Sequence, residues 1–99
     1  MAILLKVKWV DQSDQPDPYQ RISHIGGPVG ESQWKHTHAQ AIQFIEYDLF
    51  HYYVEKDAHI LRLEIGLAPN GTKYLKTPVD SHQPQLLLDL PESPQPVPR

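Results

Sequence analysis

The chain has 99 residues, no cysteine and a formal net charge of −3, and 39% of its residues are hydrophobic. This length predicts one domain with a modest core, and the apolar content argues against wholesale disorder. The acidic balance weighs against a non-specific DNA-binding protein, which is normally basic. The lack of cysteine excludes disulfides, thiolate metal sites and a Cys nucleophile. Because the opening MAILLKVKWV becomes charged too soon for a signal peptide or a membrane span, we expect a cytoplasmic protein without membrane contact.

Two strands are predicted before the first helix. Apolar and polar residues alternate over residues 3–10, which indicates a half-buried strand. Residues 11–20 are dense in Asp, Gln and Pro and predict an exposed loop. A short second strand follows at 21–25. We expect it to end at the next three residues, Gly-Gly-Pro, because glycine costs backbone entropy and proline lacks a donor.

The clearest helix signal is a capping box. Thr37 is the N-cap and Gln40, three residues later, is placed to bond back to it. Apolar residues then recur on one face, so the helix is predicted at 38–48. Strands rich in β-branched and aromatic residues follow at 51–55 and 59–67. A tight turn is expected at Lys56-Asp57, with the register of this hairpin left open.

The sequence APNG at 68–71 predicts a second hairpin, with two loop lengths to compare. A two-residue Asn-Gly loop would pair Ile65 with Lys76. A three-residue loop pairs Ile65 with Leu75 and Glu64 with Lys76, so that apolar meets apolar and opposite charges face each other. Pro, Asn and Gly also suit a type I turn followed by a left-handed glycine, so we prefer the longer loop.

The closing leucines complete the predicted domain. Four of them between residues 86 and 90 are too apolar for water and are expected to cover an edge or end of the sheet. Residues 1–90 are predicted to form a single α+β domain and 91–99 a Pro-rich flexible tail. The predicted architecture has two layers: a small antiparallel sheet, in the order β-β-α-β-β-β, with one helix packed on one face.

A basic face of the sheet is the first candidate binding site. Cations interleaved with an aromatic side chain on strands are one way in which small domains bind single-stranded nucleic acid. The alternative is a solvated sheet face on which lysines block edge-to-edge aggregation. The residues of this candidate binding face are Lys6, Lys8, Arg62, Lys73, Tyr74 and Lys76.

The second candidate is a pocket formed by two loops, with Gly26, Gly27, Trp34, Thr77 and Asp80. The glycine spacing matches neither a dinucleotide-binding fingerprint nor a P-loop. A Thr nucleophile needs an adjacent base, and neighbours on a strand point to opposite faces. The alternative is structural: the glycines form a turn, and the aspartate bonds backbone amides and anchors the closing segment. The exposed Tyr74 and Lys76 are then better candidates for function.

Six histidines raise the question of a metal site. His36 and His38 bracket the helix start, but zinc needs a third and usually a fourth ligand at fixed geometry. No spacing in the sequence completes such a set. We therefore predict no catalytic residue, no metal ligand and no cofactor, and interpret the histidines as surface or loop residues.

The order of several short motifs resembles a known family. Across most of residues 1–91 the motifs are a strand ending in IGG, then W…AI..I, YYV, KYLKTPVD and LLLDLP. They are similar to the small bacterial domain-of-unknown-function family number three thousand eight hundred ninety-two. The chain departs from the family pattern at 82–85, HQPQ. The resemblance implies a small bacterial protein that often forms a whole chain, and it implies no activity. The family pattern falls on Gly26, Gly27, Trp34, Ala41, Ile42, Ile45, Tyr52, Val54, Tyr74, Leu75, Thr77, Asp80, Leu87, Leu88 and Pro91.

Three functions are compatible with these features. The first is a non-catalytic interaction or regulatory module that binds a protein partner, or itself, through a sheet edge or a Tyr/Leu-rich surface. The second is single-stranded nucleic-acid binding by the Lys/Tyr face. The third is a small-molecule binder or enzyme near the Gly-Gly turn, which requires the loops to converge in one pocket. We rank them in this order because the first needs no catalytic set.

Overall fold

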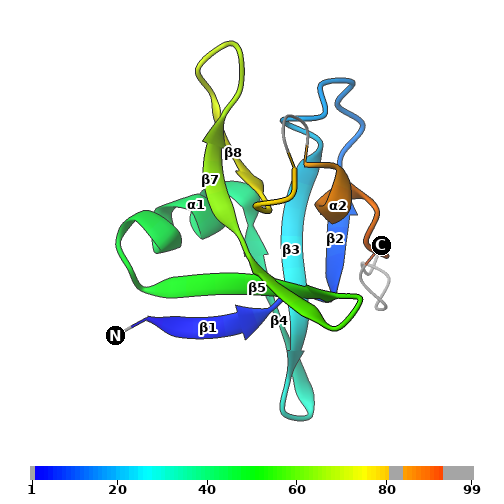
Figure 1. Cartoon of the computed structure of the whole chain (residues 1–99), viewed down its shortest axis with the longest axis vertical. Coiled ribbons are helices and arrows are strands. Elements are labelled where there is room, and N and C mark those ends of the chain that lie inside the picture. Colours follow the sequence, from blue (N-terminus) through cyan, green and yellow to red (C-terminus); the bar gives the residue numbers. More distant parts are fainter. Residues whose placement is uncertain (1, 81–83, 93–99) are drawn as a thin grey trace, which may run out of the picture.

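A computed structural model describes residues 2–80 and 84–92 of the chain and shows an α+β fold with short strands and two helices (Figure 1). Residues 93–99, most of the predicted tail, lie outside this description, as do residues 82 and 83 of the HQPQ departure. The elements in chain order are β1 (Ile3–Lys6), β2 (Trp9–Gln12), β3 (Ile22–Val29), β4 (Ser32–Thr37), α1 (His38–Glu46), β5 (Phe50–Lys56), β6 (His59–Arg62), β7 (Glu64–Leu67), β8 (Lys73–Lys76) and α2 (Gln85–Leu88).

The described strands form three small sheets instead of one. Their strand orders are β1-β5-β6, β2-β3-β4 and β7-β8. In Figure 1, β1 and β5 run side by side and β3 lies nearly at right angles to them. Such a crossing brings the inner faces of two sheets together around one core. The core includes Val10 and Ile25 from β2 and β3, Tyr52 and Val54 from β5, Leu75 from β8 and Leu87 from α2.

The predicted first strand, 3–10, is two strands in different sheets. The amide of Val7 donates to the carbonyl of Tyr53 on β5, at 2.8 Å, whereas the amide of Lys8 donates to Gly26 on β3, at 2.9 Å. The chain therefore changes sheets between these two residues. Apolar alternation continues through the change because both strands bury one face, which is why the sequence showed a single strand.

The expected stop at Gly26-Gly27-Pro28 is wrong. Strand β3 runs through these residues to Val29, and β4 returns beside it after a two-residue loop. Gly30 begins that loop with φ of 57°, as a type II′ turn requires. The residue pair that closes the loop, Val29 and Ser32, is a hydrogen-bonded pair, and bonded and non-bonded pairs alternate along the strands. Pro28 and Gln33 form the next pair, which is non-bonded. The missing proline N–H therefore costs no hydrogen bond to β4.

Strand β1 pairs in parallel with β5, whereas the other strand pairs of the described residues are antiparallel, as the sequence predicted. Parallel neighbours need a long crossover connection, and β2, β3, β4 and α1 supply it. The predicted capping box of α1 is present: Gln40 N–H donates to the Thr37 hydroxyl and Thr37 N–H to the Gln40 side chain, both at 3.0 Å. The helix ends at Glu46, before the predicted 48, because Asp48 takes a left-handed conformation with φ of 58°.

The predicted strand 59–67 divides at Leu63. Strand β6 belongs with β5, whereas β7 pairs with β8. The buried Leu63 still donates its amide to Tyr52, at 2.9 Å, and the chain then enters the second sheet. The turn before β6 consists of Asp57 and Ala58, one residue later than expected, and both residues have positive φ. This is the left-handed pair of a type I′ turn.

The hairpin of β7 and β8 has the predicted three-residue loop. Ile65 pairs with Leu75 and Glu64 pairs with Lys76. The Lys76 ammonium lies 2.7 Å from the Glu64 carboxylate. Gly71 N–H donates to the Ala68 carbonyl at 2.8 Å, and Gly71 has φ of 87°. These bonds confirm the type I turn followed by a left-handed glycine.

The closing leucines cover the edge of β2, as predicted. The Val10 amide on that strand donates to the Pro91 carbonyl at 2.9 Å. The Gln12 side chain donates to the Leu88 carbonyl at 2.8 Å. Leu87 of α2 is fully buried. The segment after Asp80 therefore serves as the closing piece of the core.

Candidate functional site

Gly26 and Gly27 lie on β3 where Trp9, Trp34 and the backbone of Lys6 pack closely against it. A β-carbon at Gly26 would lie 2.7 Å from the Trp34 carbonyl oxygen, and one at Gly27 would collide with the Lys6 carbonyl. The indole N–H groups of Trp9 and Trp34 are buried here and have no hydrogen-bond partner among the described residues. The two glycines thus allow a close strand crossing.

Thr77 and Asp80 form a clamp at the end of β8. The Asp80 carboxylate accepts from the Thr77 amide at 3.1 Å, from the Thr77 hydroxyl at 3.0 Å and from the Leu86 amide at 3.4 Å. The Thr77 side chain is fully buried. This pattern matches the structural alternative, in which the aspartate anchors the closing segment. The hydroxyl that would be a nucleophile is instead a donor inside the fold.

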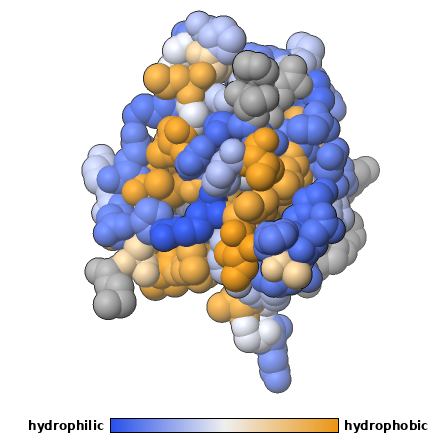
Figure 2. Space-filling model, in the orientation of Figure 1, coloured by the Kyte–Doolittle hydropathy of each residue, from blue (hydrophilic) through white to orange (hydrophobic). Residues whose placement is uncertain are grey.

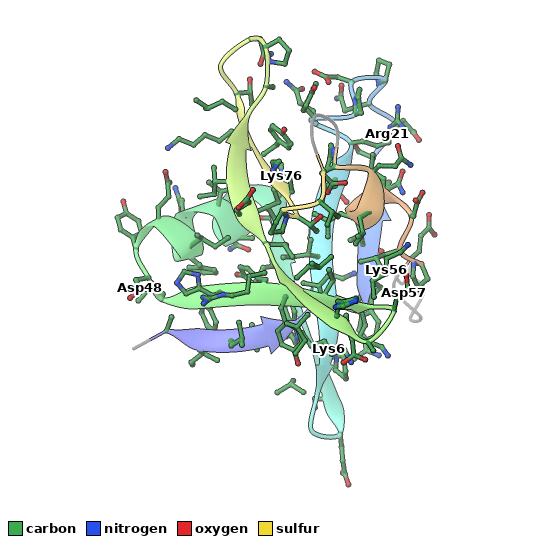
Figure 3. The ribbon with its side chains drawn as sticks, in the orientation of Figure 1. Lys6, Arg21, Asp48, Lys56, Asp57 and Lys76 are labelled. Carbon is green, nitrogen blue, oxygen red and sulfur yellow. The ribbon has the colours of Figure 1, made fainter. Side chains whose placement is uncertain are left out.

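The predicted basic face is divided between sheets. Lys6 and Arg62 lie in one row of the first sheet with Tyr53 between them, because each pairs with that tyrosine. Lys73 and Lys76 belong to β8, and Figure 3 shows Lys76 far from Lys6. Lys73 forms an ion pair with Glu46 on α1, and Lys76 forms one with Glu64. Acidic partners thus offset the two β8 cations; Lys8 is exposed beside β2.

Tyr74 is buried, so its predicted exposure is wrong. Only 4% of the residue is exposed, and Tyr19 packs edge-on against it with ring centroids 4.7 Å apart. The ring also lies over Gly66, its partner on β7, where a β-carbon would come within 2.9 Å of it. Burial raises the pKa of the Tyr74 hydroxyl. An aromatic ring held in this way cannot stack on a nucleotide base without rearrangement.

The two histidines beside the helix start have structural contacts. The His36 ring nitrogen Nδ1 lies 2.8 Å from the Tyr52 hydroxyl, and the Leu75 amide donates to His38 Nε2 at 3.2 Å. Desolvation lowers the pKa of both histidines and raises that of Tyr52. Within residues 2–80 and 84–92, no three His, Asp or Glu side chains gather as metal ligands.

The most distinctive surface feature is a groove along the free edge of β6. We call it the β6 groove; it has a volume of about 490 Å³ and is lined by Lys56, Asp57, His59, Ile60, Leu61, Val79 and Leu86. Ile60 and Val79 are each 63% exposed although both are aliphatic. Figure 2 shows hydrophobic surface gathered on this face, and Figure 3 shows Lys56 and Asp57 at the β5–β6 turn.

No residue of the β6 groove belonged to either predicted site. Val79 and Leu86 stand after β8, far along the chain from β6, so only the fold brings the two sides together. One signal was present in the sequence. Consecutive apolar residues at Ile60 and Leu61 place one of them on each face of a strand, and a half-buried strand hides only one face.

The matched region of the chain covers nearly all of the described structure. Residues 5–91 match the model of a family described as a protein of unknown function, DUF3892. No curated protein matches the chain. No solved structure matches it either. None of the helices in the described part of the chain has the length and apolar content needed to cross a membrane.

Proposed function

We propose that this chain, which belongs to the DUF3892 family, is a non-catalytic module that binds another protein at the β6 groove. One observation supports the proposal most: Ile60 and Val79 are both exposed and line the same concave, mainly apolar surface. Each Å² of apolar surface kept in water costs roughly 25 cal/mol. Concave apolar surface with charged residues at its rim is typical of binding sites.

The polar residues of the groove are placed as in a recognition surface. These polar lining residues are Lys56, Asp57 and His59, all of which are exposed. A catalytic site normally holds partly buried titratable groups whose environment shifts their pKa. The exposure of the polar residues in the groove instead supports a binding role.

Nucleic-acid binding stays the alternative prediction, and small-molecule binding near Gly26 and Gly27 the second. Neither alternative gains support from the structure around β8, where Lys73 and Lys76 form ion pairs and Tyr74 is buried. The proposed location is the cytoplasm, which the lack of cysteine supports. A bacterial source is part of the same proposal and comes from the family resemblance alone.

The test uses a phage-displayed library of random peptides as the probe, selected on the full chain. Peptides that bind the wild-type chain are then measured against Ile60→Asp and against Leu67→Asp. Leu67 is the matched control because it is an equally exposed aliphatic strand residue, at 69%, outside the groove. We expect Ile60→Asp to weaken binding about tenfold or more, since a charge is costly to bury against an apolar ligand.

Leu67→Asp should change the affinity by less than about twofold, because its charge stays in water. Equal binding by both variants would move the site away from the β6 groove. Failure to select any peptide on the wild-type chain would contradict the proposed function itself.

A further inference from the structure

We infer that the partner supplies an extended segment that adds to β6 as a further β-strand inside the groove. The inference rests on the proposed function and names the partner's conformation. It starts from the position of β6, which is the outer strand of the sheet β1-β5-β6. An outer strand presents one row of backbone N–H and C=O groups without a strand beside it.

The hydrogen-bond pattern identifies which groups form that row. In an antiparallel pair, bonded and non-bonded residue pairs alternate. Leu63 donates its amide to Tyr52 at 2.9 Å, so the Tyr52–Leu63 pair is a bonded one. The next pair, Tyr53–Arg62, is therefore non-bonded. By the same alternation, Leu61 is bonded to β5 and Ile60 is not.

Ile60 and Arg62 consequently direct their N–H and C=O groups away from β5. Among the described residues, no turn or loop hydrogen bond uses these groups. Together the two residues provide two donors and two acceptors. The two residues are about 7 Å apart, which is the length of two residues along a strand. Another extended backbone matches such a row, which is the basis of recognition by strand addition.

The lining of the groove makes the site apolar. Val79 and Leu86, from the segment after β8, line it together with Ile60 and Leu61. A strand added to β6 alternates its side chains between the two faces, so it brings an apolar residue beside Ile60 on one face and another beside Leu61 on the other. We expect an enriched segment to be apolar at successive positions over this stretch.

The side chains next to Arg62 on neighbouring strands predict which charge the bound segment carries at this position. Lys6, Tyr53 and Arg62 lie side by side on the outward face, and an added strand places a fourth residue in this row. Arg62 is exposed and forms no ion pair within the described residues. Opposite charges across neighbouring strands stabilise each other. An Asp or Glu is therefore expected opposite Arg62.

A single segment of another protein suits the groove better than a second copy of this chain. The edge of a second sheet would arrive with its own neighbouring strands attached. Val79 and Leu86 line the same groove as Ile60 and Leu61, so side chains from outside the sheet already stand beside this edge. An isolated extended peptide has no such attached bulk.

The experiment separates backbone pairing from side-chain contact. Arg62→Pro removes the outward N–H without breaking the bonds to β5, and Arg62→Ala removes the same charge but keeps that N–H. For a peptide selected on the wild-type chain, we expect Arg62→Pro to bind about tenfold more weakly than Arg62→Ala. Circular dichroism checks that both variants keep the fold.

A second measurement leaves the protein unchanged and decides the outcome even if Arg62→Pro unfolds. Single backbone amides of the selected peptide are N-methylated in turn. Loss of affinity at every second position, about tenfold each, supports the inference, because a strand turns alternate amides toward β6.

Insensitivity to methylation, with binding that still depends on Ile60, would overturn strand addition and leave the proposed function standing. A concentration-dependent dimer by light scattering that the peptide does not dissociate would also overturn it, with a second copy as the occupant. If no peptide is selected at all, the proposed function fails together with the inference.

Discussion

At the scale of single residues, His38 links protonation to the fold. It is the first residue of α1, and its Nε2 accepts the amide of Leu75 on β8. A nitrogen that accepts this bond carries no proton, so the imidazole is neutral. Burial lowers the pKa of His38 from its ordinary value of 6.5, and the positive end of the helix dipole opposes a charge at the same place.

This arrangement predicts that stability falls in acid. Because the pKa of His38 is lower in the folded chain, the unfolded chain takes up a proton first as the pH falls below 6.5. The free energy of unfolding is therefore highest above pH 6.5. It falls as the pH drops from 6.5 to the pKa of His38 in the folded chain, and the total loss is about 1.4 kcal/mol for each unit by which the folded and unfolded pKa values differ. Urea unfolding on both sides of pH 6.5 measures the loss.

His38→Gln should reduce the pH dependence, because a glutamine amide does not titrate in this range. Some dependence will remain because burial lowers the pKa of His36 with the same sign. An identical pH dependence in His38→Gln and the wild-type chain would show that His38 is not the group that titrates.

Residue-scale predictions from the sequence succeeded where the chemistry is local. Thr37 and Gln40 form their capping box within four residues of chain, so the pattern alone specifies it. The burial of Tyr74 was missed because its cover, Tyr19, comes from a loop more than fifty residues earlier. No local pattern indicates which distant side chain packs on an aromatic ring.

At the scale of elements, the β5–β6 hairpin positions the binding edge. Its turn holds Asp57 at φ of 52° and Ala58 at φ of 67°. Left-handed backbone is unfavourable for alanine because its β-carbon approaches the following carbonyl, whereas glycine has no such contact. The turn therefore stores a small strain beside β6.

Ala58→Gly should relieve that strain and raise the free energy of unfolding by about 0.5–1 kcal/mol. Ala39→Gly provides the control, because the same change at this exposed position of α1 should lower stability by about 0.5–1 kcal/mol. Urea unfolding measures both. A loss of stability in Ala58→Gly would contradict the left-handed turn and the β5–β6 register that depends on it.

Elements were predicted well when a turn defined them and poorly when packing did. The loop at 69–71 specified the register of β7 and β8 because Pro, Asn and Gly each suit one turn position. Strand β4 was missed because Gly26-Gly27-Pro28 resembles a chain break. Those glycines are required by Trp9 and Trp34, and that contact exists only in the folded chain.

At the scale of the whole molecule, three short sheets and two helices in the described part of the chain enclose one core, and no strand of that part pairs with the outer edge of β6. The closing segment secures the edge of β2, and His38 caps an amide on β8. An open edge beside an apolar groove is a site of aggregation unless a partner covers it. The fold class followed from the sequence, whereas the groove did not, because its two walls meet only through the tertiary fold.

The central claim is that an extended protein segment binds along β6. Its most direct test is an amide chemical-shift and hydrogen-exchange comparison of the isotope-labelled chain with and without a selected peptide. We predict that the largest shifts fall on β6 and on Val79 and Leu86, and that exchange slows at the outward amides of Ile60 and Arg62 but changes little at Leu61. Shifts concentrated around Lys73 and Lys76, with unchanged exchange at Ile60 and Arg62, would contradict the claim.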